Sequence, residues 1–322
     1  MKYLFIVNPV SGKRDAERVI VPKLKEWFKD KDYDWELVAT QYPQHAKELA
    51  LAAAQTGDPV RICACGGDGT LSEVVSGAFG YDNVEIAVYP CGSGNDFIKC
   101  FGAADDFQCI EEIVCAKSKP IDLLRVNEHI CMNLISVGID ADVANAMNRY
   151  RGIPLLRGPL AYNLAVAECL LKPIGKNLRL KVGDEEKSGT FILAAIGNGR
   201  VYGGGYKATP EALVDDGIID IVAVDKIPLM RIMKVLGIYK RGEHIKDGAV
   251  IEELQDCLKY YRTDRVEIDS DREFIVNIDG EIIRTSHVKI EMLHHKMKFV
   301  VPLLLSCAMS GQSARELAAV TD

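Results

Sequence analysis

The sequence has no long apolar segment. Its longest apolar stretches, FVVPLLLS and ILAAIG, fall well short of the ~20 residues that a membrane-spanning helix needs. The N-terminus, MKYLFIVNPVSG, has one lysine and a short apolar stretch, but neither the longer apolar region nor the small-residue cleavage site of a signal peptide. These absences predict a soluble, cytoplasmic protein without a transmembrane segment.

Metal and disulfide motifs are also missing. Ten cysteines are present, mostly within apolar segments, but no C-x-x-C pair occurs. The six histidines are scattered, without an H-E-x-x-H or H-x3-H pattern, so the sequence does not indicate a transition-metal site. We expect the cysteines to be buried free thiols that pack as small hydrophobic side chains, with Cys63 and Cys65 on one face of a strand.

Basic residues are in the minority. Lys and Arg number 39 against 46 Asp and Glu, which gives a net charge of −7. This excess of negative charge argues against a protein that binds nucleic acid. The 322 residues suffice for two domains of ordinary size.

Strand and helix patterns alternate in the first third of the chain. Four buried strands and three intervening helices are expected, at 2–9, 14–29, 34–40, 45–57, 60–66, 71–80 and 84–90. This alternation predicts a doubly wound parallel α/β sheet, which binds its ligand at the carboxyl ends of the strands.

After about residue 120 the pattern changes to strand alternation with turn residues. Two strands joined by a turn at Asn127-Glu128 are expected first, then a mostly helical region from 141 to 171 and a hairpin over 177–199. The last residues, 306–322, are expected to form a short helix or to fray. The second domain is therefore mainly antiparallel β, and we place the domains at 1–126 with about 297–322, and at 127–296.

Three polar or glycine-rich loops follow the first, third and fourth strands, at 8–13, 66–70 and 92–96. Glycines let a backbone approach a ligand, and the free amides at a helix start face an anion such as phosphate. Asp68 lies in the second loop, where its carboxylate would repel a bound phosphate unless a magnesium ion lay between the two negative charges. The loop is neither a Walker A motif nor a dinucleotide fingerprint, since Ser72 stands where the third glycine would fall. Together the loops predict a nucleotide site.

Two further acidic motifs occur in the second domain. The carboxylates of the adjacent Asp215 and Asp216 repel each other unless a cation or backbone amides offset their charge, which suggests a cation site. The alternative is a turn in which both side chains are solvated. In Asn277-Ile278-Asp279-Gly280-Glu281, strand alternation would place Asp279 and Glu281 on the same face, where a carboxylate could accept a hydroxyl proton. The alternative is a hairpin turn with two solvated acids.

The segments NPVSGK, GGDGTLSEVVSG, CGSGNDF, NGRVYGGGYKATPEALVDDGIIDI and VNIDGE occur in the order found in the diacylglycerol kinase catalytic family. From Asn8 to about Pro302 the chain resembles the bacterial soluble lipid kinases of that family. The resemblance implies a phosphofructokinase-like N-terminal α/β domain and a C-terminal β-sandwich, with the nucleotide in the cleft between them. It also implies ATP and Mg²⁺ as cofactors, and a lipid such as diacylglycerol as the alcohol that is phosphorylated, which gives phosphatidic acid.

The resemblance also assigns roles to residues. Asp68 and Asp96 would organise the catalytic magnesium, and Glu281 would be the base, with Asp279 as the alternative. A structural magnesium would be held by Asp216 with the main-chain carbonyls of Leu213 and Ile218. The nucleotide site would comprise Asn8, Pro9, Val10, Ser11, Gly12, Thr40, Gly66, Gly67, Asp68, Gly69, Thr70, Leu71, Ser72, Glu73, Ser93 and Asn95. Ser72 and Ser93 stand where the family more often has Asn and Thr, and both keep a hydrogen-bonding side chain.

Two segments, 149–181 and 228–245, combine basic residues with apolar ones. Such segments predict a peripheral position on an anionic membrane surface, where the lipid substrate lies. The alternative is that their apolar faces cover the second domain and their charges are solvated. Two other enzyme classes, an NAD kinase and another small-alcohol kinase, remain open, as does a non-catalytic nucleotide-sensing protein. The oligomeric state, a homodimer included, is also open.

Overall fold

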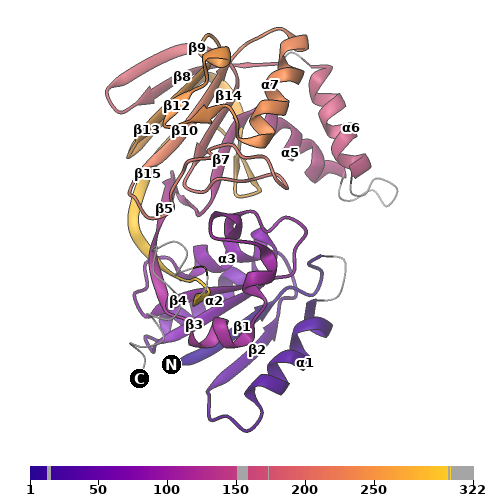
Figure 1. The fold of residues 1–322 in the computed structure, drawn as a ribbon, viewed down its shortest axis with the longest axis vertical. Helices are drawn as coiled ribbons and strands as arrows, with labels where there is room; N and C mark the ends of the chain where they lie inside the picture. The colour runs from indigo at the N-terminus through magenta and orange to yellow at the C-terminus, as the bar shows by residue number, and fades with distance from the viewer. Residues whose placement is uncertain (13–15, 151–158, 173, 304, 306–322) are drawn as a thin grey trace. The chain divides into compact units, whose positions relative to one another are not determined.

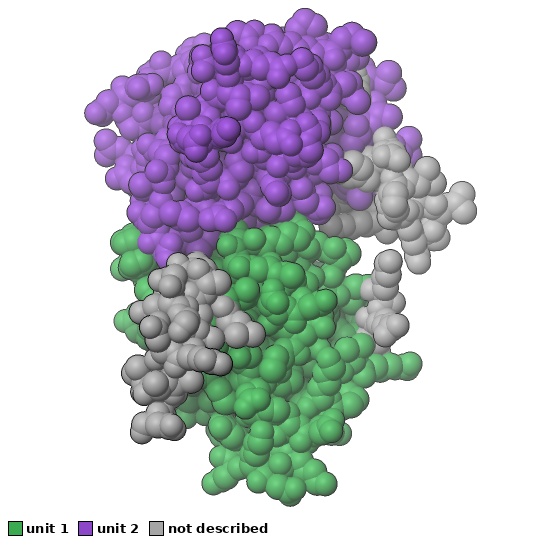
Figure 2. All heavy atoms as spheres, in the orientation of Figure 1, with its two compact units in different colours: residues 1–123, 294–322 green, residues 124–293 purple. Residues whose placement is uncertain are grey.

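The structure is a computed structural model that describes residues 1–12, 16–150, 159–172, 174–303 and 305. The chain forms two compact units, which are coloured separately in Figure 2. Unit 1 contains residues 1–123 and the chain from His294 onward, and unit 2 contains residues 124–293. The chain therefore leaves unit 1 once, within β5 (Ser118–Val126), and returns once, within β15 (Glu281–Val300).

Unit 1 is built on a parallel sheet (Figure 1). Its first four strands are β1 (Lys2–Val7), β2 (Trp35–Ala39), β3 (Val60–Gly66) and β4 (Val84–Pro90). They pair in the order β4-β3-β1-β2, and the end of β15 adds to β4 in parallel, with Phe299 opposite Ile86. β2 lies on one side of β1, and β3 and β4 lie on the other. The chain therefore winds in both directions from β1. This is the doubly wound topology expected from the sequence.

Helices cover the sheet of unit 1. α1 (Ala16–Phe28) and α4 (Ile110–Cys115) share one hydrophobic core with the sheet, in which Phe5 and Cys63 are buried. α2 (His45–Gln55) and α3 (Asp68–Ala78) pack against each other and against β3. Gly77 permits this approach, because a Cβ atom there would lie 2.2 Å from the carbonyl oxygen of Lys47. β3 is buried along its whole length, as a strand between two helical layers must be.

Unit 2 is a β-sandwich made of antiparallel strands. Its strands, besides the parts of β5 and β15, are β6 (His129–Cys131), β7 (Leu134–Gly138), β8 (Lys176–Val182), β9 (Glu185–Gly197), β10 (Ile219–Asp225), β11 (Ile245–Lys246), β12 (Ala249–Val250), β13 (Leu258–Thr263) and β14 (Arg265–Ile278). The long strands β9 and β14 each pair with β8 in one part and with β7 in another. They therefore pass from one layer to the other around a shared core that contains Phe191, Val276 and Ile290.

Within its described residues, unit 2 contains the α-helices α5 (Ile139–Tyr150), α6 (Pro159–Leu170) and α7 (Leu229–Arg241) and the short helix η3 (Glu252–Leu254). α7 is amphipathic, and its Ile232, Val235 and Tyr239 pack into a second core with β9 and β10. The sequence predicted two strands after residue 118, but the structure has three, β5, β6 and β7. The predicted turn is present, with Asn127 at φ 50°. Residues 151–158 of the expected helical region, and the terminal residues 306–322, lie outside the described residues.

All nine described cysteines are free thiols. Cys63 and Cys65 lie on one face of β3, as predicted, and Cys131, Cys169 and Cys257 are also buried. The expectation of burial is wrong for two residues, Cys109 and Cys115, which are exposed. Cys307 lies outside the described residues.

Candidate active site

Three loops meet at the carboxyl ends of β1, β3 and β4, which are neighbours in the sheet. Asn8 joins the first two: its backbone amide donates to the carbonyl of Cys65 at 2.9 Å, and its Nδ2 donates to Thr70 Oγ1 at 3.0 Å. The third loop joins the second through the amides of Cys91 and Gly92, which donate to the carbonyl of Gly66 at 2.8 and 3.1 Å. The convergence expected from the sequence is therefore present within unit 1.

The loops approach one another backbone to backbone. A Cβ atom on Gly92 would lie 2.5 Å from the Cα atom of Gly67, and one on Gly12 would lie 2.1 Å from the carbonyl oxygen of Cys91. Any larger side chain at these positions would separate the loops. Gly69 and Ser93 are nevertheless exposed, so a ligand can reach the backbone at the start of α3 from solvent.

Asp68 joins the second loop to the third. Its Oδ1 accepts the backbone amides of Asp96 at 2.6 Å and of Phe97 at 3.4 Å, at the start of the short helix η1 (Phe97–Cys100). Asp96 is buried, and its Oδ1 forms an ion pair with Lys99 Nζ at 2.6 Å. Sequence reasoning missed Lys99, although its i, i+3 spacing from Asp96 is the signal that could have found it.

The other predicted nucleotide-site residues lie on the same edge of the sheet. Thr40 follows β2, and its amide donates to the carbonyl of Val7 at 2.8 Å. Asn95 has φ 47° and donates from Nδ2 to the carbonyl of Gly92, which closes the third loop on itself. Leu71 and Thr70 are buried in the first turn of α3, whereas Ser72 and Glu73 are partly exposed on it.

In unit 2, Asp279 and Gly280 form the turn between β14 and β15. Both have positive φ, 48° and 95°, and Ile278 pairs with Glu281 across the turn. This is a two-residue hairpin turn of the kind that Asp-Gly favours. The expectation that Asp279 and Glu281 share one face of a strand is therefore wrong, because the chain reverses between them.

The carboxylate of Asp279 is not solvated. It accepts the backbone amides of Met132 at 2.6 Å, Asn133 at 3.2 Å and Leu134 at 2.9 Å. Burial raises the pKa of Asp279, and these amides act in the opposite direction. Glu281, by contrast, is exposed. The carboxylate of Asp279 thus organises the segment between β6 and β7, whereas that of Glu281 faces solvent.

The Asp215–Asp216 turn lies in an acidic part of unit 2. Asp216 accepts the amide of Ile218 at 3.1 Å and pairs with Arg262 at 2.6 Å. Asp220 is fully buried nearby: Tyr260 donates to its Oδ1, whereas its Oδ2 has no hydrogen-bond partner among the residues described. Burial raises the pKa of Asp220 to about 6; Tyr260 and the nearby Arg262 act against this rise, and the charges of Asp216 and Glu211 add to it. This excess of negative charge, with one buried oxygen unsatisfied, suits a cation.

Two family models match the chain. The diacylglycerol kinase catalytic domain matches residues 2–126, and the YegS C-terminal NAD kinase beta sandwich-like domain matches residues 133–301. A diacylglycerol kinase of Staphylococcus carnosus is 28% identical over 86% of this chain and 87% of its own length. A protein of Stenotrophomonas maltophilia described as "Probable lipid kinase YegS-like" is 31% identical over 78% of this chain and 81% of its own length. The chain belongs to the diacylglycerol kinase catalytic family. Membership makes it an enzyme, a phosphotransferase with an alcohol group as acceptor.

A solved structure agrees with the fold of this family member. A diacylglycerol kinase from Bacillus anthracis superposes with a TM-score of 0.68 at 20% identity, over 94% of this chain and 98% of that one. Within the described residues, no helix is long and apolar enough to cross a membrane.

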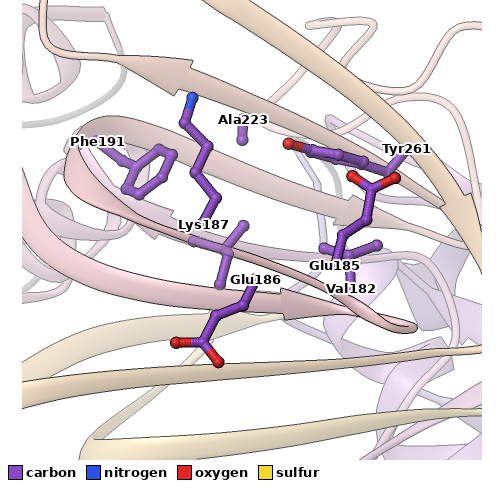
Figure 3. A pocket seen from close by; sticks show the side chains of 8 residues that line it. Val182, Glu185, Glu186, Lys187, Phe191, Ala223 and Tyr261 are labelled. Atoms are coloured by element: carbon purple, nitrogen blue, oxygen red, sulfur yellow. The ribbon is translucent and has the colours of Figure 1, made fainter.

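A small pocket of this lipid kinase family member lies in unit 2, at the turn of the β8–β9 hairpin (Figure 3). Val182, Phe191 and Ala223 line it together with Lys187, whose Nζ pairs with Asp225 at 2.7 Å. Its volume of about 30 Å³ is enough for a water molecule and far below that of an ordinary ligand pocket. None of the predicted site residues lines it, so it is not the candidate active site.

Proposed function

We propose that the protein is an ATP- and Mg²⁺-dependent lipid kinase that phosphorylates the free hydroxyl of diacylglycerol to give phosphatidic acid. We assign nucleotide binding to unit 1 and the lipid substrate to unit 2. The observation that carries the proposal is the convergence of the loops after β1, β3 and β4, tied by Asn8 and Asp68 and free of side chains at Gly67 and Gly92. Phosphoryl transfer depends on positioning and electrostatic stabilisation more than on covalent chemistry, and such loops supply both.

The loops suit the phosphates of ATP. The first amides of α3 have no acceptor within the helix, and they carry the positive end of its dipole. Gly67 and Gly69 leave these amides accessible, and Ser72 and Ser93 add hydroxyl donors. The chain's contribution is thus to bind and orient the phosphates without a P-loop lysine.

Asp68 and Asp96 would hold the catalytic magnesium. Their carboxylates are hard oxygen donors, and Gly94 brings the third loop so close that a Cβ atom there would lie 2.8 Å from Asp68 Oδ2. When bound, Mg²⁺ neutralises charge on the transferred phosphoryl group. Lys99 holds Asp96 in place through their ion pair.

We assign the base role to Glu281. A base must offer a lone pair to the hydroxyl proton, and the exposed carboxylate of Glu281 can do so. Asp279 already accepts three backbone amides, which leaves it little capacity for a proton. We therefore assign Asp279 a positioning role, in which its turn sets the direction of Glu281.

A second magnesium ion would serve a structural purpose in unit 2. Asp216 and the carbonyls of Leu213 and Ile218 would hold it, and the unsatisfied Oδ2 of Asp220 is the observation that fits a cation there. Such an ion would stabilise the segment before β10.

Membrane docking rests more on apolar side chains than on the basic segments. Seven ion pairs involve many of their basic residues: Arg149 and Lys172 with Glu168, Lys176 with Asp142, Arg179 with Glu186, Arg231 with Asp256, Lys234 with Glu253, and Arg241 with Glu243. Arg151 and Arg157 lie outside the described residues. The first turns of α7, however, expose Leu229 (50%), Met230 (87%) and Met233 (59%). We assign this apolar tip to peripheral contact with the bilayer that contains the lipid substrate.

Incubation with labelled ATP and a panel of acceptors tests the function. We expect transfer to diacylglycerol in vesicles, dependence on Mg²⁺, and no transfer to NAD or to sugar phosphates. Transfer to NAD would identify an NAD kinase, and transfer to no acceptor while ATP still binds would identify a nucleotide sensor. Either result overturns the proposal.

A further inference from the structure

Three metal-ligating side chains meet in unit 1 outside the candidate active site. Asp122 comes from β5, and His294 and His295 come from β15. One ligand atom from each residue lies within 4.8 Å of those of the other two. Pairing of β5 with β15 brings Asp122 and His294 together across 172 residues of sequence.

An irregular residue in β15 places the two imidazoles side by side. Neighbouring residues of a regular strand point to opposite faces. His295 has φ 53°, an uncommon value for a residue other than glycine, and this breaks the alternation. The rings of His294 and His295 consequently stack, with centroids 3.7 Å apart and planes at 26°.

The carboxylate beneath the rings is firmly held. The side chain of Asp122 is fully buried, and its Oδ1 accepts the amide of His295 at 2.7 Å. The same oxygen lies 2.9 Å from Nδ1 of His294, whose side chain is 50% exposed. One buried anionic oxygen therefore faces two imidazoles that are open to solvent.

We propose that Asp122, His294 and His295 bind a divalent transition-metal ion, with Zn²⁺ as the best match. Two imidazole nitrogens and one carboxylate oxygen are a donor set that zinc accepts, whereas magnesium prefers oxygen alone. Ligand atoms around tetrahedral zinc lie roughly 3.3 Å apart, which rotation of the exposed imidazoles can reach. Solvent completes the coordination on the exposed side. The ion ties β5 to β15.

A matched control lies on the same strand. His287 Nδ1 is 2.8 Å from Asp269 Oδ1, nearly the same distance as in the Asp122–His294 pair. Over the described parts of the chain, however, this pair has no third ligand within reach. The His287→Gln variant therefore removes an Asp–His pair without touching the proposed site.

The test is a Zn²⁺ titration of the full chain after treatment with a chelator, in excess Mg²⁺ and against a chromophoric zinc indicator. We expect one tight site per chain, weakened at least about tenfold in His294→Gln and in His295→Gln and unchanged in His287→Gln. The two histidines are exposed, so the His294→Gln and His295→Gln variants should fold, and circular dichroism checks that they do. Asp122→Asn is a third variant.

Co²⁺ provides a second readout. A site of nitrogen and oxygen ligands gives the visible bands of tetrahedral Co²⁺ without the near-ultraviolet charge-transfer band of a thiolate. Equal zinc affinity in all the variants, or a thiolate band from a cysteine such as the exposed Cys109, would overturn the proposal.

Discussion

The carboxylate of Asp68 accepts the backbone amide of Asp96 at 2.6 Å. One side chain thereby fixes the distance between the loops that follow β3 and β4. The two acids proposed to hold the catalytic magnesium are thus linked before any ligand arrives. This preorganisation favours electrostatic stabilisation of the transferred group, because the loops need not rearrange during the reaction.

Asp68→Asn separates the structural role of Asp68 from its charge. The amide keeps an Oδ1 acceptor for Asp96, so the melting temperature should change little. Transfer should fall by roughly 10²–10³-fold, because the anionic ligand is lost. Steady-state kinetics at saturating Mg²⁺ measure this. Asp106→Asn is the control, since the carboxylate of Asp106 likewise accepts a backbone amide, that of Ala103, at 2.7 Å. Near-full activity in Asp68→Asn would show that Asp68 takes no part in the mechanism.

Glu281→Gln and Asp279→Asn should have opposite signatures. Glu281→Gln removes the proton acceptor from an exposed position, so kcat should fall by roughly 10²–10⁴-fold with unchanged stability and ATP binding. Asp279→Asn weakens the bonds to three amides, so it should lower the free energy of unfolding by about 1–3 kcal/mol. Chemical denaturation and kcat together decide the roles. Full turnover in a folded Glu281→Gln protein would pass the base role to Asp279 or to no residue.

Magnesium should stabilise unit 2 through Asp216. At 100 times its Kd, an ion that binds only the folded state adds about 2.7 kcal/mol. Thermal unfolding with and without Mg²⁺ should show this gain in the parent and a much smaller one in Asp216→Ala. Asp256→Ala removes a comparable pair, Asp256 with Arg231 at 2.6 Å, and should keep the magnesium response. Equal responses in all three proteins would exclude the site.

The stability of the protein should depend on pH through Asp140. This residue lies in the first turn of α5; burial raises its pKa from 3.8 to about 7, and its Oδ2 has no hydrogen-bond partner in the described structure. Between these values the folded state keeps a proton that the unfolded state has lost, so stability falls as pH rises from about 4 to 7 and is level above. The contribution is at most about 4 kcal/mol.

Asp140→Asn should abolish this contribution. Denaturant melts from pH 4 to 8 would then show a flatter profile than the parent. Asp142→Asn is the control on the same helix, because Asp142 is partly exposed and pairs with Lys176 at 2.8 Å. A parent slope that survives in Asp140→Asn would assign the dependence to other groups.

The apolar tip of α7 should govern membrane binding. Replacing Met230 and Met233 together by serine should reduce sedimentation with diacylglycerol-containing vesicles by roughly tenfold or more, since two large apolar side chains no longer insert. Activity on a short-chain soluble diacylglycerol should be unchanged. Leu51→Ser, at an exposed position on α2 of unit 1, is the control. Vesicle binding that survives the double substitution would contradict this role of α7 and assign membrane binding to the basic segments.

Most of the fold of unit 1 could be predicted from local patterns in the sequence. Short apolar runs that alternate with helical patterns predicted β1 to β4 and their helices, because turn residues and the change to helical spacing mark where each run ends. The strand order of unit 2 could not be predicted, because β9 and β14 change partners part-way along, at positions that no local signal marks.

The site residues divide in the same way. The loops after β1, β3 and β4 were identifiable because parallel strands place their carboxyl ends together. At Asp279 the strand alternation failed and the alternative, a hairpin turn, is present, because Asp279 adopts a positive φ that ends the strand. The cluster at Asp122 had no sequence signal, since 172 residues separate Asp122 from His294 and adjacent histidines do not ordinarily share a face.

The return of the chain to unit 1 has a consequence for biosynthesis. Phe299 of β15 is fully buried in unit 1, pairs with Ile86 of β4 and packs on Phe97 and Phe101 at 5.4 and 5.5 Å. When residues 1–123 leave the ribosome, β4 therefore lacks this partner and presents an open strand edge and an unfilled aromatic cluster. Unit 1 closes only after all of unit 2 has been synthesised, so a nascent chain stalled before residue 294 would be a natural client for a chaperone.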